Sequence, residues 1–228
     1  MAGIKIKNLT LGTTPRVAGI IDQPMPIARL QKFAAGGVDI FEIRADLFGK
    51  PIDKVIAYID TVKESIKSPL IGTIRETDYN RADRIDWLIS LSKHVDIIDV
   101  ELGIPEWRSV VDGIAGSSTV IMVSEHDFNA TPDKPGLNNI VKRSLKQGAQ
   151  IVKIAAMAKT ASDVTRLLRF TEECDVPIVT MAMGDVGKIS RIAAPLFGSL
   201  FVYGYLRKPV VPGQLSALAV AKALKLYY

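Results

Sequence analysis

The sequence predicts a single (β/α)8 barrel of the TIM type, a catalytic domain spanning residues 1–228. The length of 228 residues is common for a one-domain α/β barrel, and 48% apolar residues are enough for a sizeable core. Eight short apolar runs rich in β-branched residues recur along the chain, with amphipathic stretches between them. Such alternation with short connections indicates a parallel sheet, and eight strands are the number that closes a barrel.

The eight runs are predicted as strands because each is short, apolar and followed by turn or helix signals. In chain order they are "RVAGIID" from Arg16, "VDIFEIRAD" from Val38, "PLIGTIRE" from Pro69, "VDIIDVEL" from Val95, "TVIMVSEHD" from Thr119, "QIVKIAAM" from Gln150, "VPIVTMAMG" from Val176 and "SLFVYGY" from Ser199. Helical periodicity fills the intervals, for example over 52–66, 81–92, 138–146 and 162–172. We expect Ser162 to cap its helix at the N-terminus, and Gly36 and Gly148 to stop theirs.

A doubly wound open sheet is the alternative to the barrel. It would normally carry a glycine-rich phosphate turn after its first strand, and "GIIDQPMP" has none. In "MGDVGKIS" the glycines stand too close together for a phosphate-cradling loop. No linker, repeat or low-complexity segment divides the chain, which favours one domain.

Bulk charge and cysteine content narrow the function classes. The net charge of +5 suits an anionic metabolite, and no basic-aromatic cluster accompanies it, so we expect no nucleic-acid partner. The sole cysteine, Cys174, excludes an internal disulfide and fits a reducing compartment. The segment "MAGIKIKNLTLG" lacks the apolar core of a signal peptide, and no apolar run approaches the ~18 residues of a membrane span. These features predict a cytoplasmic protein with no membrane partner.

Strand alternation places several polar side chains on one face of the sheet. Lys153 stands in the middle of the buried-strand pattern "GAQIVKIAAMA", where a charge costs desolvation energy unless it is paired or lost. By the same parity Glu42, Arg44, Arg75 and His126 share the inward face, near the C-terminal ends of their strands. Barrel enzymes build their active sites at that end. Five such residues of matching parity favour a site over charges that simply reach solvent.

A buried lysine beside a histidine is typical of imine chemistry. A desolvated lysine near arginines is shifted toward its neutral form, which attacks a ketone, and the resulting imine acidifies protons on the adjacent carbon. His126 is suited to move those protons, whereas His94, near a helix C-terminus, has a structural interpretation. Two distant histidines and one thiol have no zinc-ligand spacing, although carboxylates could still hold magnesium.

Several motifs, weak singly and specific together, resemble those of the type I 3-dehydroquinate dehydratases, the Schiff-base enzymes of the shikimate pathway. In the family's order they are "FEIRAD", "SEHDF" followed by "TP", "IVKIAAM", "TMAMGDVGKISR", "FGS" and "PGQ". They extend from the first strand to the C-terminal "PGQLSA", nearly the whole chain. The resemblance implies a (β/α)8 barrel, usually a homodimer. It also implies dehydration of 3-dehydroquinate to 3-dehydroshikimate in aromatic amino-acid biosynthesis, with neither metal nor organic cofactor.

The resemblance also assigns roles to individual residues. Lys153 matches the imine-forming lysine, and His126 matches the residue that removes the C2 proton and protonates the leaving hydroxyl. The matches to substrate-binding positions are Glu42, Arg44 and Arg75 for the hydroxyl groups, Arg191 and Gln214 for the carboxylate, and Met181, Met183 and Tyr203 for the apolar wall. A guanidinium is well suited to grip a carboxylate by two bonds. Gln214 lies in "RKPVVPGQLS", which we expect to act as a lid that excludes water.

The chain departs from the family pattern at two places. Bacterial members often carry "EGG" after the third-strand arginine, and its glutamate orients the histidine. Here Tyr79 stands where that acid falls; Glu76, Asp78 or Asp127 could replace it, or His126 could work less constrained. Val210 occupies the position of a lid serine that often contacts the substrate carboxylate.

Two other functions compete with the dehydratase. A class I aldolase-like barrel would use the same lysine chemistry to break a carbon–carbon bond, but aldolases of sugar phosphates need a phosphate site. A non-catalytic binding barrel has no need of a lysine, a histidine and two arginines on its inner face.

Overall fold

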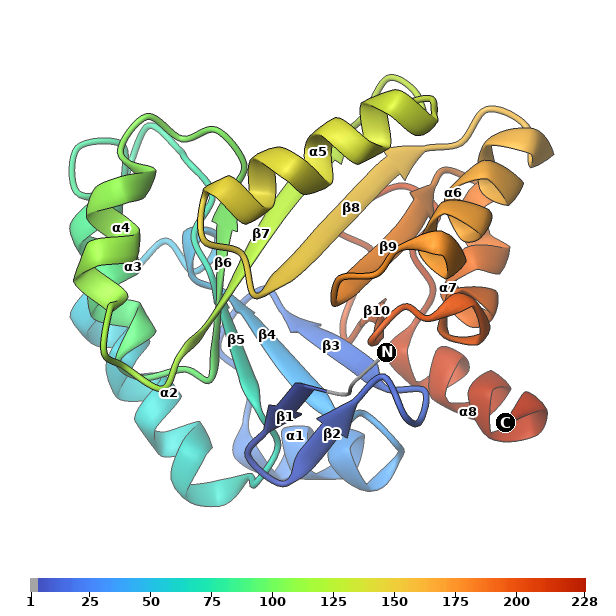
Figure 1. Ribbon diagram of the computed structural model, residues 1–228. Helices are drawn as coiled ribbons and strands as arrows, with labels where there is room; N and C mark the ends of the chain where they lie inside the picture. Colours follow the sequence, from blue (N-terminus) through green and yellow to red (C-terminus); the bar gives the residue numbers. More distant parts are fainter. Residues whose placement is uncertain (1–3) are drawn as a thin grey trace.

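The computed structural model describes residues 4–228 and contains one eight-stranded parallel sheet that curves into a barrel (Figure 1). Its strands are β3 (Val17–Ile21), β4 (Ile40–Arg44), β5 (Leu70–Thr73), β6 (Ile97–Glu101), β7 (Val120–Asp127), β8 (Ile151–Met157), β9 (Ile178–Met183) and β10 (Val202–Tyr205). They run in the order β10-β3-β4-β5-β6-β7-β8-β9, so each strand from β3 to β8 pairs with its successor in the chain. Each of the predicted runs contains one of these strands.

The last strand returns to the first, and this return distinguishes a barrel from an open sheet. Val202 of β10 pairs in parallel with Val17 of β3. At the seam between β9 and β10, the backbone N–H of Leu200 donates to the carbonyl of Ile178 at 2.9 Å. The predicted (β/α)8 barrel is therefore confirmed, and the doubly wound alternative is wrong.

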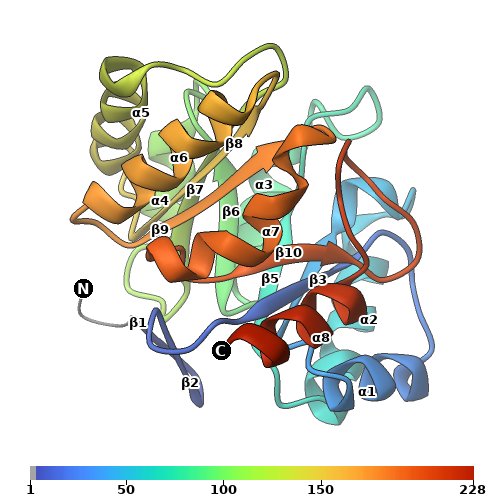
Figure 2. The same cartoon turned by 90° about the vertical axis from the view of Figure 1, so that its right-hand side faces the viewer.

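Helices surround the barrel on its outside, as Figures 1 and 2 show from two directions. They are α1 (Ile27–Ala35), α2 (Ile52–Ser65), α3 (Arg84–Ser92), α4 (Trp107–Ile114), α5 (Lys134–Lys146), α6 (Ala161–Glu173), α7 (Ser190–Ala193) and α8 (Ala217–Tyr227). Short 3₁₀ turns follow β4 as η1 (Ala45–Leu47) and flank α7 as η2 (Val186–Ile189) and η3 (Ala194–Phe197).

Two helix starts differ from the sequence prediction because local side-chain hydrogen bonds decide them. The helix predicted from residue 81 begins at Arg84, because Asn80 closes a turn by accepting from the Thr77 N–H and donating to the Arg75 carbonyl. The helix predicted from residue 138 begins earlier, at Lys134, where the side chain of Asp133 caps the Gly136 N–H.

The predicted N-cap of α6 is wrong by two residues. Thr160, not Ser162, caps the helix, and Asp163 reciprocates by accepting from the Thr160 N–H to complete a capping box. The carboxylate at the third helical position determines the start, so Ser162 lies inside the first turn. The predicted helix stops are confirmed: Gly36 is the C-cap of α1, and Gly148, with φ +86°, follows the end of α5.

The buried apolar residues form an outer layer between barrel and helices and an inner layer within the barrel. The inner layer is sealed at the N-terminal ends of the strands by a hairpin of β1 (Ile4–Ile6) and β2 (Leu9–Leu11), which the sequence analysis did not predict. Ile6 and Leu11 of this hairpin are buried among Ile40, Ile71 and the other inner residues. Because the hairpin closes the N-terminal end of the barrel, in the described part of the chain only the C-terminal end is open to a ligand. Within residues 4–228 no helix is long and apolar enough to cross a membrane.

Candidate active site

A cavity of about 50 Å³ opens at the C-terminal end of the barrel, and every residue predicted to act or bind lines it. These residues are Lys153, His126, Glu42, Arg44, Arg75, Arg191, Gln214, Met181, Met183 and Tyr203. A larger space of about 430 Å³ lies beside it and shares Arg44, Arg75, His126, Val210 and Val211. The inner cavity and this outer space together match the volume of small-molecule sites in proteins.

Strand register explains why the catalytic candidates meet. Lys153 of β8 lies directly opposite Ser124 of β7, and His126 lies opposite Ala155, two residues further along each strand. Side chains two residues apart share a face, so Lys153 and His126 both point inward from neighbouring strands. The backbone register thus places the amine one layer below the imidazole.

Lys153 is buried among polar groups and is only 4% exposed. Its Nζ donates to Asp99 Oδ2 at 2.8 Å and to the Tyr203 hydroxyl at 3.3 Å, and Glu42 Oε1 lies 3.5 Å away. The ring of Tyr203 also presents its face to Nζ, 4.3 Å from the ring centroid. The prediction placed arginines near the amine, and the structure adds two carboxylates that balance its charge.

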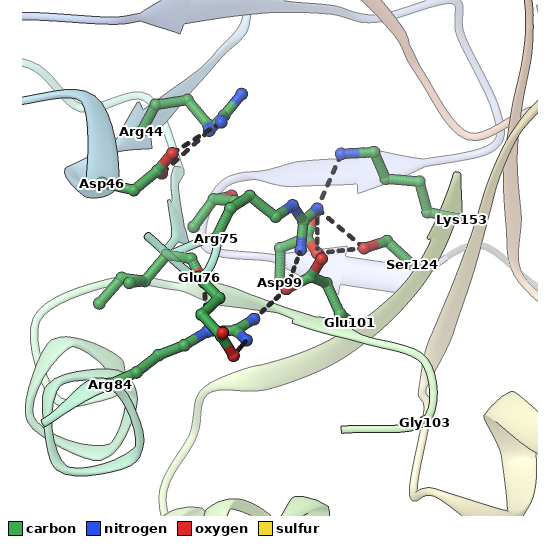
Figure 3. A network of polar contacts seen from close by, with 12 residues as sticks. Arg44, Asp46, Arg75, Glu76, Arg84, Asp99, Glu101, Gly103, Ser124 and Lys153 are labelled. Atoms are coloured by element: carbon green, nitrogen blue, oxygen red, sulfur yellow. Dashed lines mark hydrogen bonds and ion pairs between the residues drawn. The ribbon is translucent and has the colours of Figure 1, made fainter. Parts of the chain in front are cut away.

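Asp99 is the central site residue that the sequence analysis missed. Its carboxylate is fully buried, and it accepts from Lys153, from Arg75 Nη2 at 2.9 Å and from Ser124 Oγ at 2.6 Å (Figure 3). Although burial opposes ionisation, Arg75 and Lys153 hold the pKa of Asp99 well below its usual range. Strand alternation could have identified Asp99: within "VDIIDVEL" it lies on the same face as Ile97, which points into the barrel.

The polar network continues from Asp99 to the outer helices, as Figure 3 shows. Arg75 Nη1 lies 4.0 Å from Glu101, which in turn accepts from Arg84 Nη2. Arg84 is a nearly buried residue of α3, and its Nε donates to the Ile74 carbonyl at 3.1 Å. Glu101 and Arg84 thus help to fix the position of the Arg75 guanidinium. No local pattern marked Arg84, because a charged residue on an amphipathic helix usually faces solvent.

The imidazole of His126 is uncharged in this environment. Burial, followed by the nearby charges of Lys153 and Arg75, lowers its pKa to about 3. Its ring stacks on that of Phe128, with 6.2 Å between centroids and 17° between planes. Within the described part of the chain, no hydrogen bond involves the His126 ring, so the pattern of an acid orienting the histidine is not seen here.

The acids that could have oriented His126 are engaged elsewhere. Glu76 and Asp78 accept from Arg81, at 2.9 and 2.8 Å. Asp127 accepts from the backbone N–H groups of Asn129 and Ala130. Of the possibilities left open by the sequence, the structure agrees with a less constrained His126: its half-buried ring stacks on the exposed Phe128, and within residues 4–228 no carboxylate holds it.

Arg191 presents an unpaired guanidinium to the cavity. The residue is fully buried in α7, its Nε and Nη2 have no hydrogen-bond partner within residues 4–228, and its Nη1 lies 3.3 Å from Met181 Sδ. Burial lowers its pKa to about 10, so it remains a cation at neutral pH. Nearby, Gln214 accepts from the Val210 N–H at 2.9 Å and leaves its buried Nε2 without a partner. A buried, unpaired cation is costly, which indicates that an anion completes it.

The remaining polar side chains are held in place by their neighbours. Thr73 donates to Glu42 at 2.7 Å, and Asp46 accepts two hydrogen bonds from Arg44, at 2.7 and 3.1 Å. Within residues 4–228, no group of three or more His, Cys, Asp or Glu side chains is placed to hold a metal ion. The side chains that line the cavity can orient a polar anionic ligand against the amine of Lys153.

Comparisons with known proteins agree on one family. Residues 23–228 match the model of the type I 3-dehydroquinase family. The 3-dehydroquinate dehydratase of Methanocella arvoryzae is 36% identical over 196 residues, covering 83% of this chain and 88% of that protein. That of Methanococcoides burtonii is 33% identical over 232 residues, covering 98% and 99%.

Solved structures extend the similarity to the fold. The type I 3-dehydroquinate dehydratase of Clostridium difficile, solved with covalently modified comenic acid, is 30% identical and superposes with a TM-score of 0.85 over 99% of this chain and 97% of that chain. The Geobacillus kaustophilus 3-dehydroquinate dehydratase is 27% identical, with a TM-score of 0.86 over 98% and 95%. The matching barrel and the match over residues 23–228 show that the chain belongs to the type I 3-dehydroquinase family.

Proposed function

We propose that this chain is a hydro-lyase that converts 3-dehydroquinate to 3-dehydroshikimate and water in the shikimate pathway, through an imine between Lys153 and the substrate ketone. The observation that carries the proposal is that one cavity holds the buried amine of Lys153, the neutral imidazole of His126 and the unpaired guanidinium of Arg191. Family membership favours this reaction over the aldolase-like and non-catalytic alternatives.

Substrate recognition follows from the charges around the cavity. The carboxylate of 3-dehydroquinate would bind the free N–H groups of Arg191 and the unpaired amide of Gln214, which removes the cost of burying them. Its hydroxyl groups would meet Glu42, Arg44 and Arg75, whose positions are set by their own partners. Met181 and Met183 would pack against the carbocycle. The loop between β10 and α8, which carries Val210 and Gln214, would close over the bound substrate.

The chemistry begins with attack of the Lys153 amine on the substrate ketone, which expels water and leaves a protonated imine. The imine withdraws electrons from the neighbouring C2, and His126, uncharged in the resting site, accepts the C2 proton. The electron pair of that C–H bond forms the new double bond as the C1 hydroxyl departs. His126 returns its proton to the leaving hydroxyl, and hydrolysis of the product imine restores Lys153.

Borohydride trapping tests the imine directly. The protein is incubated with 3-dehydroquinate and borohydride, and peptide mapping locates any added mass. We expect a reduced adduct on Lys153 and none on Lys159, an exposed lysine that follows the same strand. Absence of an adduct on Lys153 in an active preparation would overturn the mechanism.

Two substitutions separate the proposed roles. Lys153→Ala is expected to abolish turnover while 3-dehydroquinate still binds, whereas the matched Lys159→Ala keeps wild-type turnover. His126→Ala is expected to form the imine with little turnover, and near-normal turnover in that variant would remove His126 from the proton-transfer role. Steady-state assays together with trapping in each variant supply the measurements.

We also propose that the protein is cytoplasmic and, as the family resemblance implies, a homodimer. The end of α8 and the neighbouring η3 turn supply apolar surface for a contact between subunits: Leu196, Leu226 and Tyr227 are each more than 70% exposed, and the Tyr228 hydroxyl donates to the Ile192 carbonyl. Sedimentation analysis at micromolar concentration is expected to report a dimer, and a monomer under those conditions would contradict it.

A further inference from the structure

We propose that the hydroxyl group of Tyr203 is a catalytic hydrogen-bond donor that assists formation and hydrolysis of the imine at Lys153, rather than an apolar wall of the site. This inference rests on the proposed Schiff-base function. It assigns to Tyr203, as its partner, the former ketone oxygen after the bond from Nζ has given that oxygen a negative charge. The argument starts from where β10 holds the side chain.

Tyr203 is fixed against the reacting amine. It lies in β10, is 2% exposed, and packs edge-on against Phe201, with 5.5 Å between ring centroids. Its oxygen lies 3.3 Å from Lys153 Nζ, and its ring face lies 4.3 Å from the same atom. Hydroxyl and ring therefore both contact the nucleophile, and packing leaves the side chain little freedom to move away.

The O–H hydrogen of Tyr203 is not used in its contact with Lys153. In the contact with Lys153 the amine donates and the tyrosine oxygen accepts. Within residues 4–228, no acceptor takes the hydrogen of the Tyr203 hydroxyl, and the residue lines the cavity. Burial, aided by the carboxylates of Glu42 and Asp99, raises the pKa of Tyr203 well above its usual value, so the hydroxyl keeps its proton at neutral pH. A buried tyrosine hydroxyl usually pairs, which indicates that a ligand oxygen is its acceptor.

The chemistry of imine formation places an oxygen beside this donor. When Nζ bonds to the ketone carbon, the π electrons move to the oxygen, which is then two bonds from Nζ and gathers negative charge. A hydroxyl in contact with Nζ is positioned to donate to that oxygen. An ammonium has no lone pair, so Nζ first releases one proton to Asp99, its hydrogen-bond partner. That proton and one of the two left on the attacking amine depart with the ketone oxygen as water, which restores the Asp99 carboxylate, and the last proton remains on the imine nitrogen. Tyr203 keeps its own proton, and the same contact serves the reverse reaction during hydrolysis.

The wall interpretation alone does not account for these contacts. An apolar wall requires the ring but not a hydroxyl buried next to two carboxylates and a cation, because burying a polar group costs free energy unless it is used. Phenylalanine at this position would preserve the ring against Lys153 and Phe201 and remove only the oxygen. Tyr203→Phe therefore isolates the proposed role.

Rapid-quench trapping with borohydride tests the proposal. With saturating 3-dehydroquinate, the adduct on Lys153 is expected to form at least tenfold more slowly in Tyr203→Phe than in wild type; removal of a single oxyanion donor slows other enzymes about 10²- to 10³-fold. Tyr205→Phe removes the same oxygen two residues along β10, outside the cavity, and is expected to form the adduct at the wild-type rate. Thermal unfolding midpoints verify that both variants are folded.

A second readout separates catalysis from structure. Affinity for 3-dehydroquinate is measured in Lys153→Ala and in Lys153→Ala combined with Tyr203→Phe, where no imine can form. The two affinities are expected to agree within twofold, whereas a distorted site would bind more weakly. Adduct formation in Tyr203→Phe within twofold of wild type, or a matching loss of affinity, would overturn the role of Tyr203. Absence of any Lys153 adduct in wild type would instead overturn the proposed function.

Discussion

Lys153 is surrounded by charged groups of both signs, and these groups determine which residues of the site are ionised. The amine pairs with Asp99 and approaches Glu42, while Arg75 shares the Asp99 carboxylate. The cations next to His126 disfavour its protonation, as burial does. The site therefore combines the ion-paired amine of Lys153 with the neutral imidazole of His126, on neighbouring strands at the C-terminal end of the barrel.

Replacement of Asp99 is expected to destabilise the fold as well as the site. Asp99→Asn leaves Lys153 and Arg75 buried without their shared carboxylate, and breaking a buried pair by removing one partner costs about 3–5 kcal/mol. Urea unfolding at pH 7 measures the loss. The exposed pair Lys134–Glu173 provides the comparison, because Lys134→Ala is expected to change stability by less than about 1 kcal/mol. An Asp99→Asn variant as stable as Lys134→Ala would contradict this account.

His126 makes stability depend on pH in a definite direction. Its pKa of about 3 in the folded protein lies below the value of about 6.5 expected when unfolded, so between those values the unfolded chain binds the extra proton. Stability therefore rises with pH across this window and falls on acidification. In His126→Asn, the slope of unfolding free energy against pH between 4 and 6 is expected to shrink by up to about 1.4 kcal/mol per pH unit.

Urea titrations at several pH values give these slopes. His94→Asn is the companion variant, because it shows how much of the slope comes from the chain's other histidine, which pairs with Asp60 near the surface. Equal slopes in wild type and His126→Asn would show that burial does not suppress protonation of His126.

At the scale of elements, loops that touch one another position the carboxylate-binding residues. Gly213 lies in the loop between β10 and α8, with φ +72°, and the Pro212 carbonyl accepts from the Gly184 N–H of the loop after β9. A Cβ at Gly213 would come within 2.1 Å of the Gly184 carbonyl oxygen. The close approach holds Gln214 beside the segment that leads to Arg191, so binding depends on contact between two loops.

Gly213→Ala is expected to separate these loops and to weaken substrate binding. The added methyl group clashes with backbone, which must shift, and Gln214 moves with it. We expect KM for 3-dehydroquinate to rise about tenfold, equivalent to one hydrogen bond of about 1.4 kcal/mol, with Lys153 still trapped by borohydride at saturating substrate. Gly116→Ala is the matched control, since its φ of +81° is similarly strained but a Cβ there meets nothing within 4 Å. An equal KM in both variants would show that substrate binding does not depend on the contact between the two loops.

For the whole molecule, the apolar seal of the barrel and the candidate active site lie at opposite ends. The β1–β2 hairpin closes the N-terminal end of the barrel (Figure 1). Ile6 and Leu11 of the hairpin are buried there among the inner residues, and the polar side chains line the cavity at the C-terminal end. Layers of buried apolar residues lie between the hairpin and the cavity and separate them.

Leu11→Ala tests this separation. Leu11 is fully buried, so its truncation is expected to cost about 2–5 kcal/mol of unfolding free energy. Because the site lies at the other end, kcat and KM are expected to stay within twofold of wild type at a temperature where the variant is folded. Thermal unfolding and steady-state kinetics measure the two quantities, and a large change in KM would show that the hairpin is coupled to the site.

The alternation of residues along strands was sufficient to predict much of the architecture and the inward residues. Period-two parity brought Lys153, His126, Glu42, Arg44 and Arg75 to one face, and the cavity lining agrees with that placement. The order of the strands follows from right-handed, short β–α–β connections. Helix starts were less accurate, as at α6, whose N-cap is Thr160 rather than Ser162, because a single side-chain hydrogen bond decides such a position.

By itself, the sequence determined the barrel, the inward face and the end of the barrel where the site lies, because these depend on local periodicity and chain order. Only the tertiary structure decided which groups pair: Asp99 with Lys153, Arg84 with Glu101 and the hydroxyl of Tyr203 with the amine. It also decided that His126 is stacked on Phe128 rather than held by an acid. Hydrogen bonds and desolvation act over a few ångströms in space, between residues that are far apart in the chain, so no local pattern specifies them.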